Sequence, residues 1–203
     1  LCGGQLSYRK EDRAQQALGH VHPNINEAKI VATYHQLSRY HSLPLVHMQA
    51  AEGLRKAGGS LAAMANEFVQ WAADDLKTYF RRSYDPASGK FVALMIDGTR
   101  IDGAKSRTGY YVPESFAPVE PDGLLLWSCA MAYRLTRDQE LWQMARQLGS
   151  RLGIGELGEP DGRKQSLRLD TDRDDWRLIC ALLELHQATG RVEMLRVACR
   201  VAD

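Results

Sequence analysis

Apolar residues recur every three or four positions along most of the chain, and this spacing predicts amphipathic α-helices. In the first half we expect three of them. The first runs from about Ile25 to His41, the second restarts after Pro44 and ends at Gly58, and the third spans Leu61 to about Tyr84. The hydrophobic pattern therefore indicates an all-α protein.

One weak β signal interrupts this helical pattern. Lys90–Ile96 has the composition of a short strand, Asp97-Gly98 is a dipeptide typical of hairpin turns, and Thr99–Ile101 fits a return strand. We therefore expect one small β-hairpin, carried in a long loop.

The second half contains an internal repeat. The segments LLLWSCAMAYRLTRDQELWQMAR and LICALLELHQATGRVEMLRVACR each consist of an apolar helix, a short turn with a threonine, and a second helix. The matching residues lie 53 positions apart (189 − 136 for the threonines): Thr136 and Thr189, Leu141 and Met194, Trp142 and Leu195, Ala145 and Ala198. Recurring helical hairpins predict an α-solenoid or a closed α/α toroid, and the long loops favour the toroid. We expect residues 1–203 to form a single all-α domain of helical hairpins that is part of an α/α toroid.

Composition narrows the choice of partners. The formal net charge of the 203 residues is only +1, so charge gives no reason to expect nucleic acid or a membrane surface as a partner. Apolar runs stay well short of the roughly 20 residues that span a bilayer. The chain starts without a methionine and stops inside a helical repeat, so we expect it to be a truncated piece of a longer protein.

The cysteines are far apart and form no C-x-x-C pair. They are Cys2, Cys129, Cys180 and Cys199. The last three lie within helical apolar patterns, so we interpret them as buried free thiols. The redox compartment therefore stays open.

The histidines do not have the spacing of a metal site. His20 and His22 form an H-x-H pair without an obvious third ligand, and His35, His41 and His47 follow at intervals of six. A helix presents residues four apart, not six apart, on one face. We interpret these histidines as surface or packing residues and expect this chain to bind no metal.

An acidic run near the end of the chain resembles a calcium loop but lacks the glycine and terminal glutamate of that motif. Basic residues alternate with the acidic ones, which favours a helix start with self-paired charges. The residues concerned are Asp170, Asp172, Asp174 and Asp175, with Arg168, Arg173 and Arg177.

The strongest candidate for binding is the long loop between Met95 and Trp127, which lacks helical periodicity. It holds Arg107, Tyr110 and Tyr111, and its further positive charges are those of Arg100 and Lys105. A guanidinium pairs with a carboxylate, and tyrosine rings stack on apolar sugar faces. This chemistry suits an acidic sugar polymer. The alternative is that the tyrosines simply anchor the loop.

Several stretches, in this order, resemble the carboxy-terminal half of the family 2 polysaccharide lyases, which are pectate and exopolygalacturonate lyases with an α/α toroid fold. These stretches are LSYRKEDRAQQALG, LVHMQAAEGLRKAGG, WAADDLKTYFRRSYDPASGKFVALMIDGTRIDG, SRTGYY and DGLLLWSCAMAYRLTRDQELWQMARQLGSRLGIGELG. The likeness extends from about Leu6 to Arg200 and rests on structural motifs rather than on catalytic ones.

The resemblance implies metal-assisted β-elimination of polygalacturonate, in which the intact enzyme uses a divalent metal such as manganese. In this family the base is an arginine directly followed by a histidine, and the metal is held by two histidines and a glutamate. The chain contains neither an Arg-His dipeptide nor the other ligand segments. The catalytic residues therefore stay unknown, and we expect this chain alone to be inactive. A bacterial periplasmic or a cytoplasmic location is equally open.

Two other functions are compatible with the same pattern. Another toroid enzyme, a glycoside or uronyl hydrolase, would need a pair of carboxylates, for which Asp97, Asp102 and Glu114 are the loop candidates. A non-enzymatic helical-repeat scaffold that binds a protein partner would more often have short, regular linkers.

Overall fold

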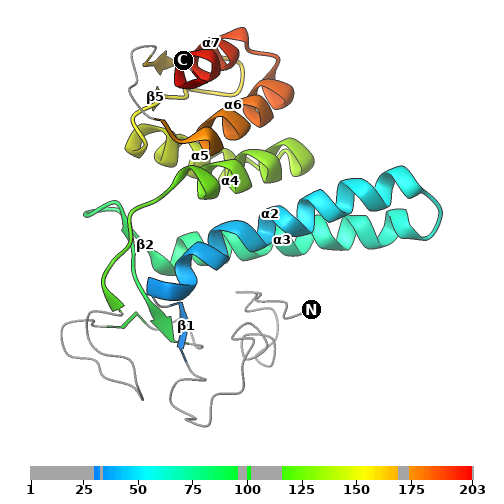
Figure 1. Cartoon of the computed structure of the whole chain (residues 1–203), viewed down its shortest axis with the longest axis horizontal. Helices are drawn as coiled ribbons and strands as arrows, with labels where there is room; N and C mark the ends of the chain where they lie inside the picture. Colours follow the sequence, from blue (N-terminus) through cyan, green and yellow to red (C-terminus); the bar gives the residue numbers. More distant parts are fainter. Residues whose placement is uncertain (1–29, 33, 96–99, 102–115, 169–173, 203) are drawn as a thin grey trace. The chain divides into compact units, whose positions relative to one another are not determined.

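The computed structural model describes residues 30–32, 34–95, 100–101, 116–168 and 174–202, and within these ranges it is mostly helical (Figure 1). In chain order the elements are β1 (Ile30–Ala32), α2 (Tyr34–Ala57), α3 (Leu61–Ser83), β2 (Tyr84–Asp85), β3 (Lys90–Phe91), β4 (Leu94–Met95), α4 (Gly123–Thr136), α5 (Gln139–Arg151), β5 (Gly155–Glu156), β6 (Ser166–Leu167), α6 (Trp176–Thr189) and α7 (Val192–Ala202). The prediction of an all-α chain with a small antiparallel β element is confirmed.

The chain divides into two compact units. Unit 1 comprises Leu1–Pro44 and Asp74–Glu120, and unit 2 comprises Leu45–Ala73 and Pro121–Asp203. The helices α2 and α3 contribute residues to both units. Each unit is described by itself below, and the single-domain assignment of residues 1–203 stays a prediction.

The beginning of α2 differs from the sequence prediction. Residues Ile30–Ala32 form β1, which pairs antiparallel with β4 through Ile30 and Met95, and the helix starts only at Tyr34. The predicted helix over Ile25–His41 is therefore wrong at Ile30–Ala32. Pairing with a strand more than sixty positions later overrides the local helical period, and such a distant partner leaves no local signal.

Pro44 does not separate two helices, because α2 continues through it to Ala57. The predicted restart after Pro44 is thus wrong. Proline fixes φ at a value that an α-helix accepts, and it removes only its own backbone donor. The predicted end at Gly58 is confirmed, since Gly58 has a φ of 74° directly after the helix. The third predicted helix corresponds to α3, which starts at Leu61 and ends at Ser83.

The small hairpin of unit 1 lies earlier in the chain than predicted. It pairs β2 with β3, and Asp85 organises its turn by accepting hydrogen bonds from the Ala87 and Ser88 amides at 3.3 and 3.2 Å. The predicted strand Lys90–Ile96 is split into β3 and β4. The predicted return strand is represented by a single bridge from Leu94 to Arg100, and Asp97-Gly98 lies outside the described residues.

Aromatic side chains form the core of unit 1. Phe91 is fully buried and stacks on Tyr79 with ring centroids 4.8 Å apart, while Phe80 meets it edge-on at 5.2 Å. The backbone N–H and C=O of Phe91 also pair with Val119, both at 2.8 Å. This central position of Phe91 ties the end of α3 to the segment that leads into unit 2.

The 53-residue repeat is confirmed by the element boundaries of unit 2. The starts of α4 and α6 differ by 176 − 123 = 53, their ends by 189 − 136 = 53, and the starts of α5 and α7 by 192 − 139 = 53. The repeat extends to single hydrogen bonds. Thr136 donates its hydroxyl to the Ala132 carbonyl, and Thr189 donates to that of Leu185, both at 2.7 Å.

The helices α4 and α6 pack side by side and run parallel (Figure 1). At their starts the two N-cap residues are Asp122 and Asp175, and at their far ends the Arg137 guanidinium donates to the Ala188 carbonyl. A β-carbon on Gly123 would lie 2.5 Å from an oxygen of Asp175. Gly123 therefore permits a closer approach of the two helices than any other residue would allow.

The tip of the α2–α3 hairpin packs on the end of α4 within unit 2. A buried cluster of Ala51, Ala65 and Val69 contacts Leu135. Next to it, the guanidinium of Arg134 donates to the carboxylates of Glu52, at 2.7 Å, and Glu184. Because removing one partner of such a half-buried group leaves unpaired charge, Arg134 fixes the relative positions of α2, α4 and α6.

Replacing Gly123 tests the close approach of α4 and α6. In Gly123→Ala the new methyl group displaces the Asp175 carboxylate that caps α6, so the free energy of unfolding should fall by about 1 kcal/mol. Gly53 is the matched control, because it lies in α2 with nothing within 4 Å of an added β-carbon. Gly53→Ala should instead raise stability by about 0.5–1 kcal/mol. Urea titrations measure both variants, and a stabilised Gly123→Ala would disprove the close approach.

His47 predicts a pH dependence of stability. It lies in α2, 5.7 Å from the ring of Phe68, and burial lowers its pKa below 6.5. The folded state thus disfavours the protonated imidazole, and the free energy of unfolding should be highest above pH 6.5 and fall as the pH drops below 6.5. Asp85, Asp161 and Glu156 have lowered pKa values, so their contributions are lost only at more acidic pH.

The measurement is urea unfolding at intervals between pH 8 and about pH 5, the range in which an ordinary histidine titrates. His47→Phe keeps an aromatic ring beside Phe68 and should flatten the curve over this range. An unchanged slope in His47→Phe would show that another group is responsible.

Candidate functional site

Of the five residues predicted to bind substrate, only Arg100 lies within the described residues. Lys105, Arg107, Tyr110 and Tyr111 lie outside them, as do the hydrolase candidates Asp97, Asp102 and Glu114. The described structure therefore leaves the roles of these seven residues as predictions. It does describe the two stems from which the segment 102–115 departs.

The two stems meet on the same small core of unit 1. Ile101, at the start of the segment, packs against the buried pair Ala93 and Phe116, and Phe116 is the first described residue after the segment. The amide of Ile101 also donates to the Ala93 carbonyl at 3.0 Å. A long loop whose two ends are fixed next to each other on a core can hold its side chains over a defined place.

Arg100 holds the first stem in place. Its Nε donates to the Arg82 carbonyl at 3.0 Å, and its Nη2 donates to the Tyr84 carbonyl at 2.6 Å. Both acceptors lie where α3 ends and β2 begins, so the guanidinium satisfies carbonyl groups at the end of a helix. The edge formed by Nε and Nη2 is the one that grips a carboxylate in a bidentate pair. In this structure that edge contacts backbone, which assigns Arg100 an anchoring role, while its contact with substrate stays a prediction.

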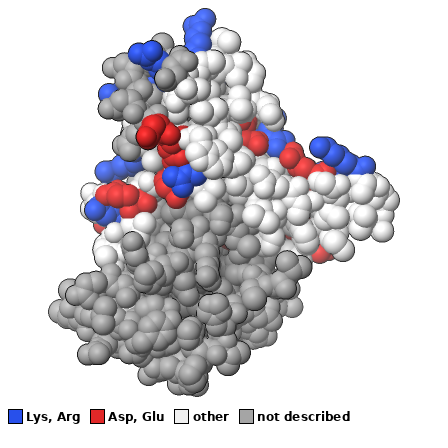
Figure 2. Space-filling model, viewed as in Figure 1, with Lys and Arg blue, Asp and Glu red and all other residues white. Residues whose placement is uncertain are grey.

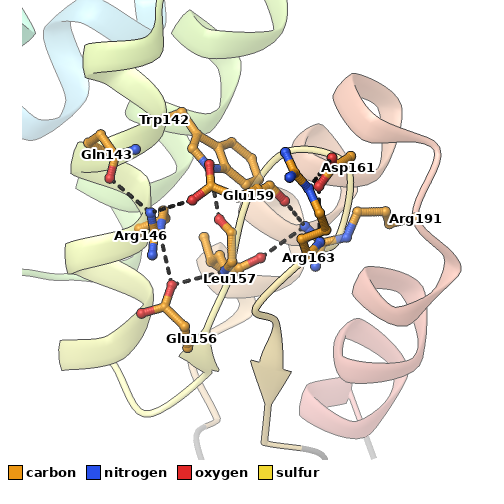
Figure 3. A network of polar contacts seen from close by, with 10 residues as sticks. Trp142, Gln143, Arg146, Glu156, Leu157, Glu159, Asp161, Arg163 and Arg191 are labelled. Carbon is orange, nitrogen blue, oxygen red and sulfur yellow. Dashed lines mark hydrogen bonds and ion pairs between the residues drawn. The ribbon is translucent and has the colours of Figure 1, made fainter.

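A second polar cluster lies in unit 2, between α5, the β5–β6 loop and α7 (Figure 3). Arg146 donates to Glu156 at 2.9 Å, and its ion pair with Glu159 spans 3.4 Å. Burial tends to raise the pKa of Glu156, but the Gly158 amide and the Arg146 guanidinium outweigh it, so this pKa lies below its usual range. An ionised carboxylate that is held in this way is a poor proton donor near neutral pH. The cluster therefore fastens the loop and is not a suitable acid–base pair.

The same loop is fixed from two other helices (Figure 3). Arg191, which is 8% exposed, donates through Nη1 to the carbonyls of Leu157 and Glu159 at 2.9 and 3.1 Å. The buried Trp142 indole donates to the Gly158 carbonyl at 2.9 Å. Sequence reasoning missed this network. The signal was the run of glycines between α5 and α6, since Gly155, Gly158 and Gly162 all adopt positive φ.

The acidic run before α6 is described from Asp174 onward, and there the prediction of self-paired charges is confirmed. Asp175 accepts hydrogen bonds from the backbone amide and the Nε of Arg177, at 3.1 and 2.6 Å. The Nη1 of Arg177 also lies 3.8 Å from the Asp122 carboxylate. On the face seen in Figure 2, acidic side chains of the described residues lie beside basic ones.

The described residues do not fit a metal centre. They contain no group of three or more histidine, cysteine, aspartate or glutamate side chains able to hold an ion. His20 and His22 lie outside the described residues, and His186 accepts or shares a hydrogen bond with the Arg191 carbonyl at 3.0 Å. Within the described ranges there is also no helix long and apolar enough to cross a membrane.

The cysteines fit the sequence interpretation only in part. Cys129 is fully buried, and burial raises the pKa of its thiol, so it is an inert packing residue. Cys180 is half-buried, and Cys199 is exposed on α7. The prediction of a buried thiol is therefore wrong for Cys199, because the apolar pattern of α7 places its buried stripe at Met194, Val197, Ala198 and Val201.

Comparison with known families agrees with the resemblance seen in the sequence. A family model described as periplasmic pectate lyase matches residues 6–203, which is almost the whole chain. The matched range includes the loop stems, the anchoring Arg100 and both helical hairpins of the repeat. The chain therefore belongs to the periplasmic pectate lyase family.

Proposed function

We propose that this chain is part of a periplasmic lyase that cleaves polygalacturonate by β-elimination. The match of residues 6–203 to the periplasmic pectate lyase family is the observation that carries this proposal. The family description favours the periplasm over the cytoplasm. The substrate is an acidic polysaccharide, whose repeating carboxylates call for cationic side chains in the binding site.

The segment 102–115 supplies those side chains. Arg107 pairs with a uronate carboxylate through its planar fork, Tyr110 and Tyr111 stack on sugar rings, and Lys105 adds attraction for the polyanion. The support for this assignment is the fixed position of the two stems, Ile101 and Phe116, on Ala93. Arg100 stabilises the first stem through the carbonyls of Arg82 and Tyr84.

The reaction removes the proton at C5, next to the carboxylate, and breaks the bond from C4 to the bridging oxygen. A cation paired with the carboxylate makes that proton more acidic, because negative charge develops on the carboxylate as the proton leaves. Within the described ranges no side-chain cluster fits the divalent metal that the family resemblance implies. We assign neither the base nor a metal ligand to this chain, and we expect the chain alone to bind substrate without turning it over.

The product distinguishes elimination from hydrolysis. The polypeptide that carries this chain is incubated with polygalacturonate, with and without a chelator. Elimination leaves a C4–C5 double bond, so ultraviolet absorbance should rise, and the chelator should suppress this rise. New reducing ends without ultraviolet absorbance would indicate a hydrolase and contradict the proposal.

Arg107→Ala tests the binding loop directly. Loss of one charge-assisted pair should weaken the binding of trigalacturonate by about tenfold, which corresponds to roughly 1.4 kcal/mol. Isothermal titration calorimetry on the 203-residue chain measures the affinity. The matched control is Arg163→Ala, since Arg163 is 77% exposed and pairs only locally with Asp161 at 2.7 Å. Equal affinities for Arg107→Ala and the unmodified chain would remove Arg107 from the site.

A further inference from the structure

An uncharged stripe lies along one side of α6. It consists of Trp176, Cys180, Leu183 and Gln187, which follow one another at intervals of four, three and four and so share one helix face. Trp176 is 61% exposed and Leu183 is 40% exposed, and Cys180 between them is half-buried. We call these four residues the α6 stripe.

The repeat gives the α6 stripe an exact counterpart on α4. Subtracting 53 leads to Gly123, Trp127, Ala130 and Arg134. These are the α4 positions that face α6. Gly123 lies against Asp175 and Leu178, the Trp127 ring is 6.1 Å from that of Trp176, and Arg134 bonds Glu184. Ala130, between them on the same face, is fully buried.

The same face is therefore covered in one copy of the repeat and open in the other. On α4 it is the contact surface for the next helix, α6. On α6 it carries a tryptophan and a leucine that remain in contact with water, which forgoes about 25 cal/mol for each Å² of apolar surface. In arrays of helical hairpins, each hairpin buries such a face against its neighbour.

We propose that the α6 stripe is the docking face for a third hairpin of this repeat, whose first helix lies parallel to α6. Continuity with the α4–α6 interface identifies this occupant. Its inward face resembles the one that α6 turns toward α4, with an N-cap aspartate and leucines equivalent to Asp175, Leu178 and Leu185. Because Trp176 stands where α4 has Gly123, the first turn of the third helix lies farther from α6 than α6 lies from α4.

A second copy of the chain fits this face less well. In a two-fold symmetric pair of α6 helices whose axis is perpendicular to them, the helices run antiparallel. This arrangement brings the Trp176 end of one stripe against the Gln187 end of the other, so tryptophan meets a polar side chain. The parallel arrangement of α4 and α6 is the one that the structure already shows.

The test extends the chain by one more repeat. Position 203 is equivalent to position 150 (203 − 53), so a second copy of residues 151–203, placed directly after Asp203, continues the repeat in register. The copied cysteines are replaced by alanine. The rate of Cys180 alkylation, followed by peptide mass spectrometry, reports coverage of the α6 stripe. Extension should slow this rate by about tenfold, equivalent to ~1.4 kcal/mol of docking free energy, and circular dichroism should show added helix.

Two substitutions control for non-specific effects. Leu183→Glu places a charge in the α6 stripe and should restore rapid alkylation of Cys180 in the extended chain. Met64→Glu introduces the same charge at an equally accessible site on α3, where Met64 is 46% exposed, and should leave the protection intact. An unchanged Cys180 rate on extension would overturn the proposal. So would protection of Cys180 that grows with concentration in the unextended chain, since a second copy would then be the occupant.

Discussion

The parallel packing of α4 against α6 is the interaction on which the rest of unit 2 depends. Gly123 lets the two helix starts come so close that a β-carbon there would lie 2.5 Å from the Asp175 carboxylate. Asp175 in turn caps α6 and holds Arg177. Each of these helices pairs with the helix that follows it, so the contact between α4 and α6 determines how the two hairpins are arranged.

Polar contacts then fix what the helix packing leaves free. Arg134 joins α4 to Glu52 and Glu184, and Arg191 and Trp142 bind three consecutive carbonyls of the β5–β6 loop, those of Leu157, Gly158 and Glu159. These groups are buried or half-buried and bonded in the structure, which is the condition under which buried polar groups rigidify a fold. Unit 2 thus behaves as a scaffold, and its carboxylates are engaged in holding that scaffold together.

Unit 1 applies the same division of labour to the proposed binding segment. Ile101 and Phe116 pack on Ala93, and Arg100 ties the first of these stems to the end of α3. Fixed stems reduce the entropy that a long loop loses when it binds a ligand. The cationic and aromatic residues between the stems are then available for substrate, because they are not required for the core that the described residues form.

The features that were predictable from the sequence are those set by local periodicity. The repeat, its threonines, the helix α3 and the end of α2 at Gly58 all follow from residues close in the chain, and the structure confirms them. β1 was missed because its partner β4 lies far along the chain, and Pro44 was misread because a buried helix tolerates one lost hydrogen bond.

The candidate site was predictable only in kind. Loop composition pointed to an acidic sugar, and the family match supports that class of substrate. The anchoring contacts of Arg100 depend on backbone carbonyls sixteen and eighteen residues away, for which a sequence gives no signal. The polar network around Arg191 is likewise formed by residues more than thirty positions apart.

The central claim is that a rigid helical scaffold carries a substrate-binding segment at residues 102–115. Hydrogen–deuterium exchange of the 203-residue chain, with and without saturating trigalacturonate, tests it most directly. We expect ligand-dependent protection in peptides that cover residues 102–115 and unchanged exchange in α4 to α7. Protection confined to the helices, or none at all, would contradict this account.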